Sequence, residues 1–196
     1  KVISIFSFLG IMLGVAILII VMSVMNGFKT ELTKKILGLN PHVVIQSNSF
    51  KIEDDFIENL KKNIQNINIS KTYSGEGIVV SNDNAKGIII KGIDINNEKR
   101  LNFLKQNISK GDLNKFDKNT AFIGAELAFN LNLKIGDKIN LMSSSFISTP
   151  FGGLPKQETF IIKGFFNTGF YEFDQNFVFL NLFDALSIFD KEKHDQ

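Results

Sequence analysis

The side chains best able to do chemistry are few in this sequence and stand far apart. It has two histidines, His42 and His194, and neither an H-E-x-x-H pattern nor a paired-histidine spacing that could hold zinc. It has no cysteine, which excludes disulfides and zinc-thiolate sites and is compatible with either side of a membrane. We therefore expect no metal site.

The acidic and glycine-rich candidates for catalysis have simpler explanations. Asp54 and Asp55 form a carboxylate pair at the start of a predicted helix, where negative charge favours the helix dipole. Gly75-Glu76-Gly77 lacks the third glycine of a dinucleotide loop, and neither a Walker A pattern nor a G-x-S-x-G elbow occurs. We expect no catalytic residue, no enzyme activity and no cofactor in this chain.

The distribution of charged residues along the chain indicates whether nucleic acid is an expected partner. The 22 basic and 20 acidic residues give a net charge of +2 and form no block of like charge. Proteins that bind nucleic acid usually concentrate basic residues on one surface. Nucleic acid is therefore not an expected partner.

The element on which the rest of the chain depends is at its start. No charged side chain occurs over residues 2–28, and about twenty apolar helical residues suffice to cross a bilayer. A signal peptide would have a shorter apolar core and a small-residue cleavage site, and a buried helix of a soluble protein rarely lacks a polar stripe. We predict a transmembrane helix over residues 1–27.

One face of this helix carries small residues. Ser7, Gly10 and Gly14 are spaced by three and four, which places them together and would let another helix approach closely. Glycine is also frequent in membrane helices generally, so chance is the alternative explanation. We predict a helix-packing face at these three residues.

A stalk helix is predicted over residues 28–40. Phe28, Leu32 and Ile36 continue an apolar helical stripe, and Gly38 with Pro41 supplies the stop signals. Lysines flank the membrane helix on both sides, and long domains cross membranes largely regardless of charge. The lysines therefore do not decide the orientation.

Residues 41–196 are predicted to form one mixed α/β domain, which makes the fold class α+β. Short apolar runs bounded by turn residues indicate strands, and amphipathic runs indicate helices. The predicted strands are 42–47, 77–81, 87–93, 120–123, 138–142, 158–165 and 176–180, and the predicted helices are 53–65, 98–106, 125–130 and 182–189.

Residues 143–158, between two of these strands, are the most informative part of the domain. This predicted loop is too long for a tight hairpin turn and displays Phe146, Ile147, Phe151 and Leu154 around Gly152-Gly153. We interpret it as a projecting hairpin whose apolar tip contacts a partner, with prolines limiting the entropy lost on binding. The alternative is that Phe151 and Leu154 fold back onto their own domain.

Several segments resemble the LolC/LolE family, the membrane subunits of the ABC-type lipoprotein-releasing complex. SVMNGF at 23–28 and ILGLNP at 36–41 recur together at the spacing of its first membrane helix and stalk. GAELA at 124–128, with Leu133 and Gly136-Asp137, is similar to the signature of the periplasmic core domain shared with MacB-type permeases. The seven residues at 149–155 are similar to the LolC hook, a hairpin that recruits the carrier LolA.

The resemblance implies a location, partners and sites. It places the chain in the bacterial inner membrane with its large domain in the periplasm, and it implies a LolD-type ATPase that binds ATP, a second LolC/LolE-type subunit, a LolA-type carrier, lipoprotein cargo and membrane lipid. The implied carrier-binding residues are Thr149, Pro150, Phe151, Gly152, Gly153, Leu154 and Pro155. Met22, Met25 and Phe28 are expected to touch lipoprotein acyl chains, with ordinary helix packing as the alternative.

Other functions remain open at this point. Members of the family have three further membrane spans after the periplasmic domain, so this chain is expected to be a fragment. One alternative is a MacB- or FtsX-like permease that transmits force to an efflux partner or a cell-wall hydrolase. Another is a single-pass sensor with a periplasmic ligand domain.

Overall fold

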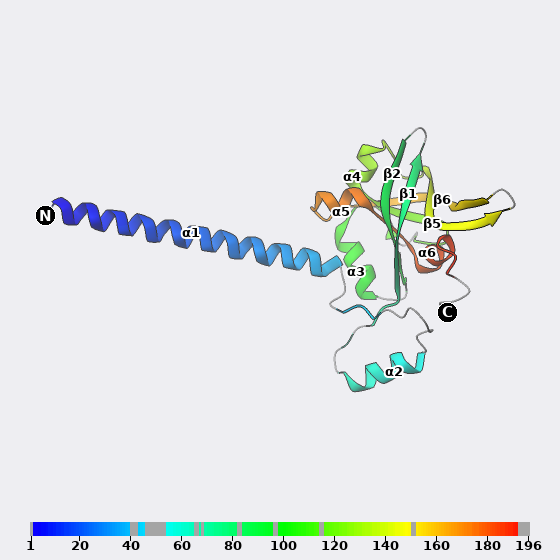
Figure 1. The fold of residues 1–196 in the computed structure, drawn as a ribbon, viewed down its shortest axis with the longest axis horizontal. Helices are drawn as coiled ribbons and strands as arrows, with labels where there is room; N and C mark the ends of the chain where they lie inside the picture. Colours follow the sequence, from blue (N-terminus) through cyan, green and yellow to red (C-terminus); the bar gives the residue numbers. More distant parts are fainter. Residues whose placement is uncertain are drawn as a thin grey trace. The chain divides into compact units, whose positions relative to one another are not determined.

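A computed structural model describes residues 2–39, 43–45, 54–64, 67, 69–81, 84–95, 98–113, 116–149 and 152–191. The chain divides into two compact units, residues 1–45 and 46–196. The first contains a long helix and the second a mixed α/β domain (Figure 1). The predicted class, an apolar N-terminal helix followed by a mixed α/β domain, is therefore confirmed.

The helix of the first unit, α1 (Val2–Leu39), is continuous over 38 residues. Its segment Val2–Thr33 is the one stretch among the described residues that is long and apolar enough to cross a membrane. Every side chain over residues 2–31 is exposed, and apolar surface of this extent is stable only in lipid or against partner helices. The predicted strand at 42–47 lies mostly outside the described residues, and no strand occurs at 43–45.

Within the described residues of the second unit, seven strands form a sheet in the order β3-β6-β4-β7-β2-β1-β5. Because β5 also pairs with β6, six strands close into a ring and β3 extends along β6. The β2–β7 and β4–β6 pairs are parallel and the others are antiparallel. The strands are β1 (Thr72–Ser81), β2 (Asn84–Ile93), β3 (Ile108–Gly111), β4 (Thr120–Gly124), β5 (Lys138–Thr149), β6 (Gly152–Phe166) and β7 (Phe177–Asn181).

The helices of this unit are short, and two of them complete its core. They are α2 (Asp54–Asn63), α3 (Glu98–Asn107), α4 (Ala125–Asn130), α5 (Tyr171–Asn176) and α6 (Leu182–Ile188). Leu127 of α4 and Ala185 and Ile188 of α6 are buried with aliphatic and phenylalanine side chains of the strands. Along β6, buried and half-buried residues alternate from Phe160 to Phe166, the period of a strand with one core face.

The signature residues at 124–137 stabilise the turns around α4. A Cβ atom at Gly124 would lie 1.7 Å from the Asp174 carbonyl oxygen, so this position accepts only glycine. Gly136 has a φ of +97°, and its N–H donates to the Ile162 carbonyl at 2.8 Å. The Asp137 carboxylate accepts a hydrogen bond from the Lys134 N–H at 2.8 Å.

Some elements differ from the sequence-based prediction. The strands β1 and β2 begin earlier than predicted, and β3 and α5 were not predicted because they are too short to show a period. The predicted loop at 143–158 is largely strand, because β5 continues to Thr149 and β6 begins at Gly152. Its serines and glycines have low strand propensity, and cross-strand pairing overrides that preference.

Candidate functional site

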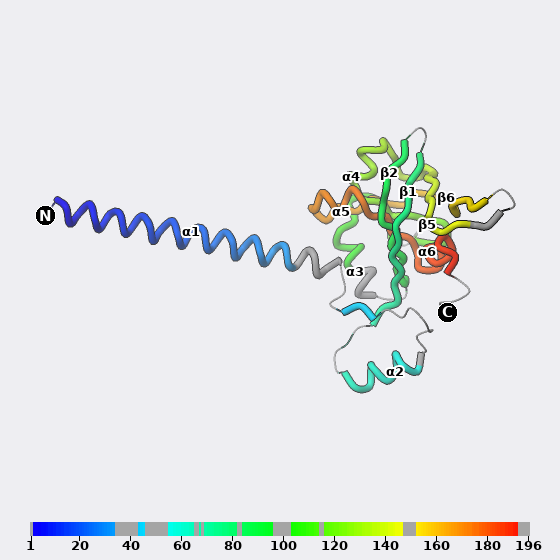
Figure 2. The backbone as a smooth tube through the Cα atoms, in the orientation of Figure 1, coloured from blue at the N-terminus to red at the C-terminus, as the bar shows by residue number. Residues whose placement is uncertain are grey.

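Residues 143–158, here called the hook, form the part of β5 and β6 that leaves the sheet. β1 pairs with β5 only as far as Ser143, so beyond that residue β5 pairs with β6 alone. The pairs run from Phe146↔Pro155 to Thr149↔Gly152 and make a two-stranded ribbon. The yellow ends of β5 and β6 extend past the other strands in Figure 1, and the tube of Figure 2 shows the yellow start of β6 in the same place.

The ribbon exposes apolar side chains on both of its faces. Phe146 is 69% exposed and Leu154 is 60% exposed. Because paired residues share a face and neighbours alternate, Phe146 and Leu154 lie on opposite faces. The ribbon therefore presents one large apolar side chain on each face, and either could be buried by a partner.

The predicted carrier-binding residues occupy the end of this ribbon. Thr149 is the last residue of β5, and Pro150 and Phe151 lie outside the described residues. Gly152 has a φ of +117°, a conformation that favours glycine, and Gly153 lies against the Phe146 ring. Leu154 is exposed and Pro155 is half-buried, so neither of the described apolar residues folds into the domain core.

The base of the hook is bonded to the C-terminal end of α6. Lys156 Nζ donates to the Ser187 carbonyl at 2.5 Å, Ser143 Oγ to the Ile188 carbonyl at 2.6 Å, and Ser145 Oγ to the Phe189 carbonyl at 2.8 Å. These contacts were missed in the sequence, where the serine run indicated only a loop. A serine run carries no signal for a partner more than thirty residues away.

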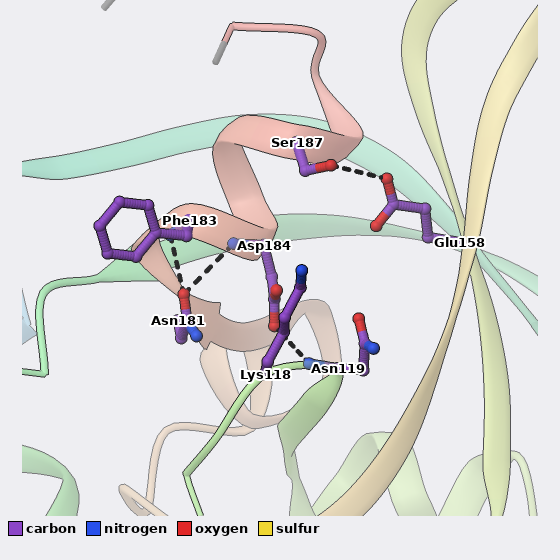
Figure 3. Close-up of a pocket in the computed structure, with 7 residues that line it drawn as sticks. All are labelled: Lys118, Asn119, Glu158, Asn181, Phe183, Asp184 and Ser187. Atoms are coloured by element: carbon purple, nitrogen blue, oxygen red, sulfur yellow. Dashed lines mark hydrogen bonds between the residues drawn. The ribbon is translucent and has the colours of Figure 1, made fainter. Parts of the chain in front are cut away.

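A pocket of about 350 Å³, lined by six polar residues and Phe183, lies beside this base (Figure 3). In Figure 3 the Ser187 hydroxyl points to Glu158, to which it donates a hydrogen bond at 3.0 Å. Asp184 accepts from the Asn119 N–H at 2.7 Å, and Asn181 caps α6. These polar groups are used in internal structure, and the described residues contain no group of three potential metal ligands among His, Cys, Asp and Glu.

The predicted sites on α1 are exposed apolar surface. Met22, Met25 and Phe28 are each more than half exposed. Met25 and Phe28 contribute with Ile20, Val21 and Val24 to a shallow concavity lined only by apolar atoms. On the predicted packing face, nothing outside the neighbouring helix backbone lies within 4 Å of the position that a Cβ would take at Gly10 or Gly14, so a partner helix could approach there.

Comparison with known proteins shows which family and which proteins this chain is similar to. Residues 4–194 match the model of the family described as MacB-like periplasmic core domain. A lipoprotein-releasing system transmembrane protein LolC from Buchnera aphidicola is 35% identical over 98% of this chain and 48% of its own length. A LolC from Xylella fastidiosa is 26% identical over 95% of this chain and 46% of its own length. A LolE from Haemophilus influenzae is 34% identical over 71% of this chain and 35% of its own length. The chain thus spans about half the length of the LolC proteins it matches, or less for LolE.

Proposed function

Since this chain belongs to the family of proteins with a MacB-like periplasmic core domain, we propose that it is a membrane subunit of an ABC-type lipoprotein-releasing complex. In this role it helps to extract lipoproteins from the inner membrane and passes them to a soluble carrier of the LolA type. The names of the similar LolC and LolE proteins support the proposal. In this arrangement α1 spans the inner membrane and the second unit lies in the periplasm.

The observation that carries the proposal is the apolar ribbon of the hook. Phe146 and Leu154 are exposed on its two faces. Both lie beyond Ser143, where β5 and β6 pair only with each other. A carrier whose cavity accepts lipid has an apolar rim, and burying a leucine-sized side chain against it stabilises the contact by about 2 kcal/mol. The exposed ribbon therefore fits a soluble partner that must dock and leave repeatedly.

In this proposal, α1 performs the part of the function that takes place in the membrane. Extracting an acyl chain from a bilayer costs about 0.8 kcal/mol for each CH₂, so the extracted chains need an apolar surface to receive them. Met22, Met25 and Phe28 provide such a surface, and flexible methionine suits chains of varied shape. The face of Ser7, Gly10 and Gly14 then packs against a second LolC/LolE-type subunit.

The energy for extraction comes from outside this chain. A LolD-type ATPase binds and hydrolyses ATP, and this chain acts as a subunit without catalytic activity of its own. Among the described residues, the buried carboxylates of Asp174 and Asp184 accept internal hydrogen bonds.

Binding of the carrier to hook variants tests the proposal. We expect Leu154→Ser and Phe146→Ser each to weaken the affinity of the chain, in detergent, for the purified LolA-type carrier about tenfold. The matched control is Phe129→Ser, which removes a phenylalanine that is 82% exposed on α4, apart from the hook in Figure 1. All three variants change exposed residues and should alter the free energy of unfolding by less than about 0.5 kcal/mol.

The binding results that support the proposal differ from those that contradict it. Loss of affinity in both hook variants with no change in Phe129→Ser supports a carrier-docking hook. Equal affinity in all three variants, or no measurable binding by the unaltered chain, contradicts the proposal.

A further inference from the structure

The hook needs an anchor at its base. Beyond Ser143 it is a two-stranded ribbon, and an isolated two-stranded hairpin in water is marginally stable and twists readily. Its direction must therefore be fixed where it leaves the sheet.

The strand pairing is irregular at that level. Between the pairs Met142↔Gln157 and Phe146↔Pro155, the three residues 143–145 of β5 lie opposite the single residue Lys156 of β6. A bulge of this kind redirects side chains that regular pairing would point elsewhere. Ser143 and Ser145 turn toward α6, whereas Ser144 between them is exposed.

The bulge side chains meet the last carbonyls of α6. The Ser187, Ile188 and Phe189 carbonyls accept in turn from Lys156, Ser143 and Ser145. The Ser187 carbonyl also accepts from the Asp190 N–H at 2.9 Å. Carbonyls at a helix C-terminus carry partial negative charge, so hydroxyl and ammonium donors are favoured there. Lys156 also lies 3.8 Å from Glu158 and 3.9 Å from Asp190.

The end of α6 is itself fixed to the sheet. Asp190 has a φ of +55°, and the Lys191 N–H donates to the Leu186 carbonyl, which closes the helix in a Schellman-type turn. Phe189 is buried, with its ring centroid 5.1 Å from that of Tyr73 and its edge over Gly75. A support of this kind can hold the hook in one direction.

We propose that Ser143, Ser145 and Lys156 are positioning residues that clamp the base of the hook to the C-terminal end of α6 and so fix the direction in which the hook projects. The consequence for carrier capture rests on the proposed function, but the clamp itself does not. A fixed hook binds its partner without first losing the entropy of a swinging ribbon.

Distances between paired spin labels test the clamp directly. The chain has no native cysteine, so labels attach only at introduced ones. One pair joins Leu154→Cys on the hook to Asn130→Cys on α4, and a reference pair joins Asn130→Cys to Lys138→Cys at the start of β5. In the chain carrying Ser145→Ala and Lys156→Met, we expect the hook distance distribution to broaden and its maximum to shift, while the reference pair is unchanged.

Matched variants isolate the cause. Ser144→Ala and Lys138→Met remove an exposed serine and an exposed lysine of β5 and should leave the hook distribution unchanged. Lys156→Arg keeps a donor for the Ser187 carbonyl and should retain the narrow distribution. If the double variant loses its fold, which the reference pair reports, Ser145→Ala and Lys156→Met alone provide the comparison.

Carrier affinity forms the second readout. The unclamped hook should bind a purified LolA-type carrier about fivefold more weakly. An unchanged hook distribution in the clamp variants overturns the clamp, whatever the carrier does. A broadened distribution in a chain that never bound the carrier supports the clamp and contradicts the proposed function instead.

Discussion

Gly124 shows how one residue can fix the junction between a strand and two helices. It ends β4, precedes α4, and lies so close to the Asp174 carbonyl that a methyl group there would overlap the backbone. Asp174 is itself buried, and its carboxylate accepts from the Thr168 N–H and hydroxyl and from the Gly169 N–H. Neither side of the contact can therefore move easily.

We expect Gly124→Ala to lower the free energy of unfolding by about 3 kcal/mol, because the backbone must shift to admit the methyl group. Thermal unfolding of the chain in detergent, followed by circular dichroism, measures this loss. Gly87→Ala is the control, since nothing lies within 4 Å of the position of its Cβ. Equal melting temperatures for the two variants would show that the junction is not tightly constrained.

For individual residues, the sequence predicts some structural roles well and others poorly. A projecting hairpin containing Leu154 could be predicted, with folding back onto the domain as the alternative that its 60% exposure excludes. The roles of Ser143, Ser145 and Lys156 could not, because their partners lie on α6 and only the folded chain brings them together.

At the scale of elements, α1 is the best predicted part of the chain. An uncharged apolar run has one simple solution in a membrane, a helix that satisfies its own backbone. The hook was predicted as a projecting hairpin, but its strands reach further toward the tip than predicted, because serine and glycine favour loops unless a neighbouring strand pairs with them. Such pairing depends on residues distant in the sequence.

The packing face of α1 gives a prediction for the element. Gly14→Leu fills the space that a partner helix would use, so we expect it to weaken association with a second LolC/LolE-type subunit by about 1 kcal/mol, or fivefold. Copurification with the tagged second subunit measures the effect. Ala16→Leu adds nearly the same bulk, three carbon atoms against four, on the other side of the helix and should copurify normally. Undiminished copurification of Gly14→Leu would remove the packing face.

At the scale of the whole molecule, the two units divide the proposed work. The first exposes mainly apolar and no charged side chains over residues 2–28, as lipid contact requires, and the second closes six strands into a ring that gives the hook a firm base. A closed ring leaves few unpaired strand edges, so the strands are less able to separate when force acts on the sheet. Docking of a carrier at the hook is the claim on which this division depends.

Photo-crosslinking in native membranes tests that claim most directly. A photoreactive amino acid replaces Leu154 in the hook or, as a control, the more exposed Phe129 on α4. The proposal predicts a covalent adduct with the LolA-type carrier at position 154 and none at position 129, identified by mass spectrometry. The absence of a carrier adduct at position 154, or equal adducts at both positions, would contradict it.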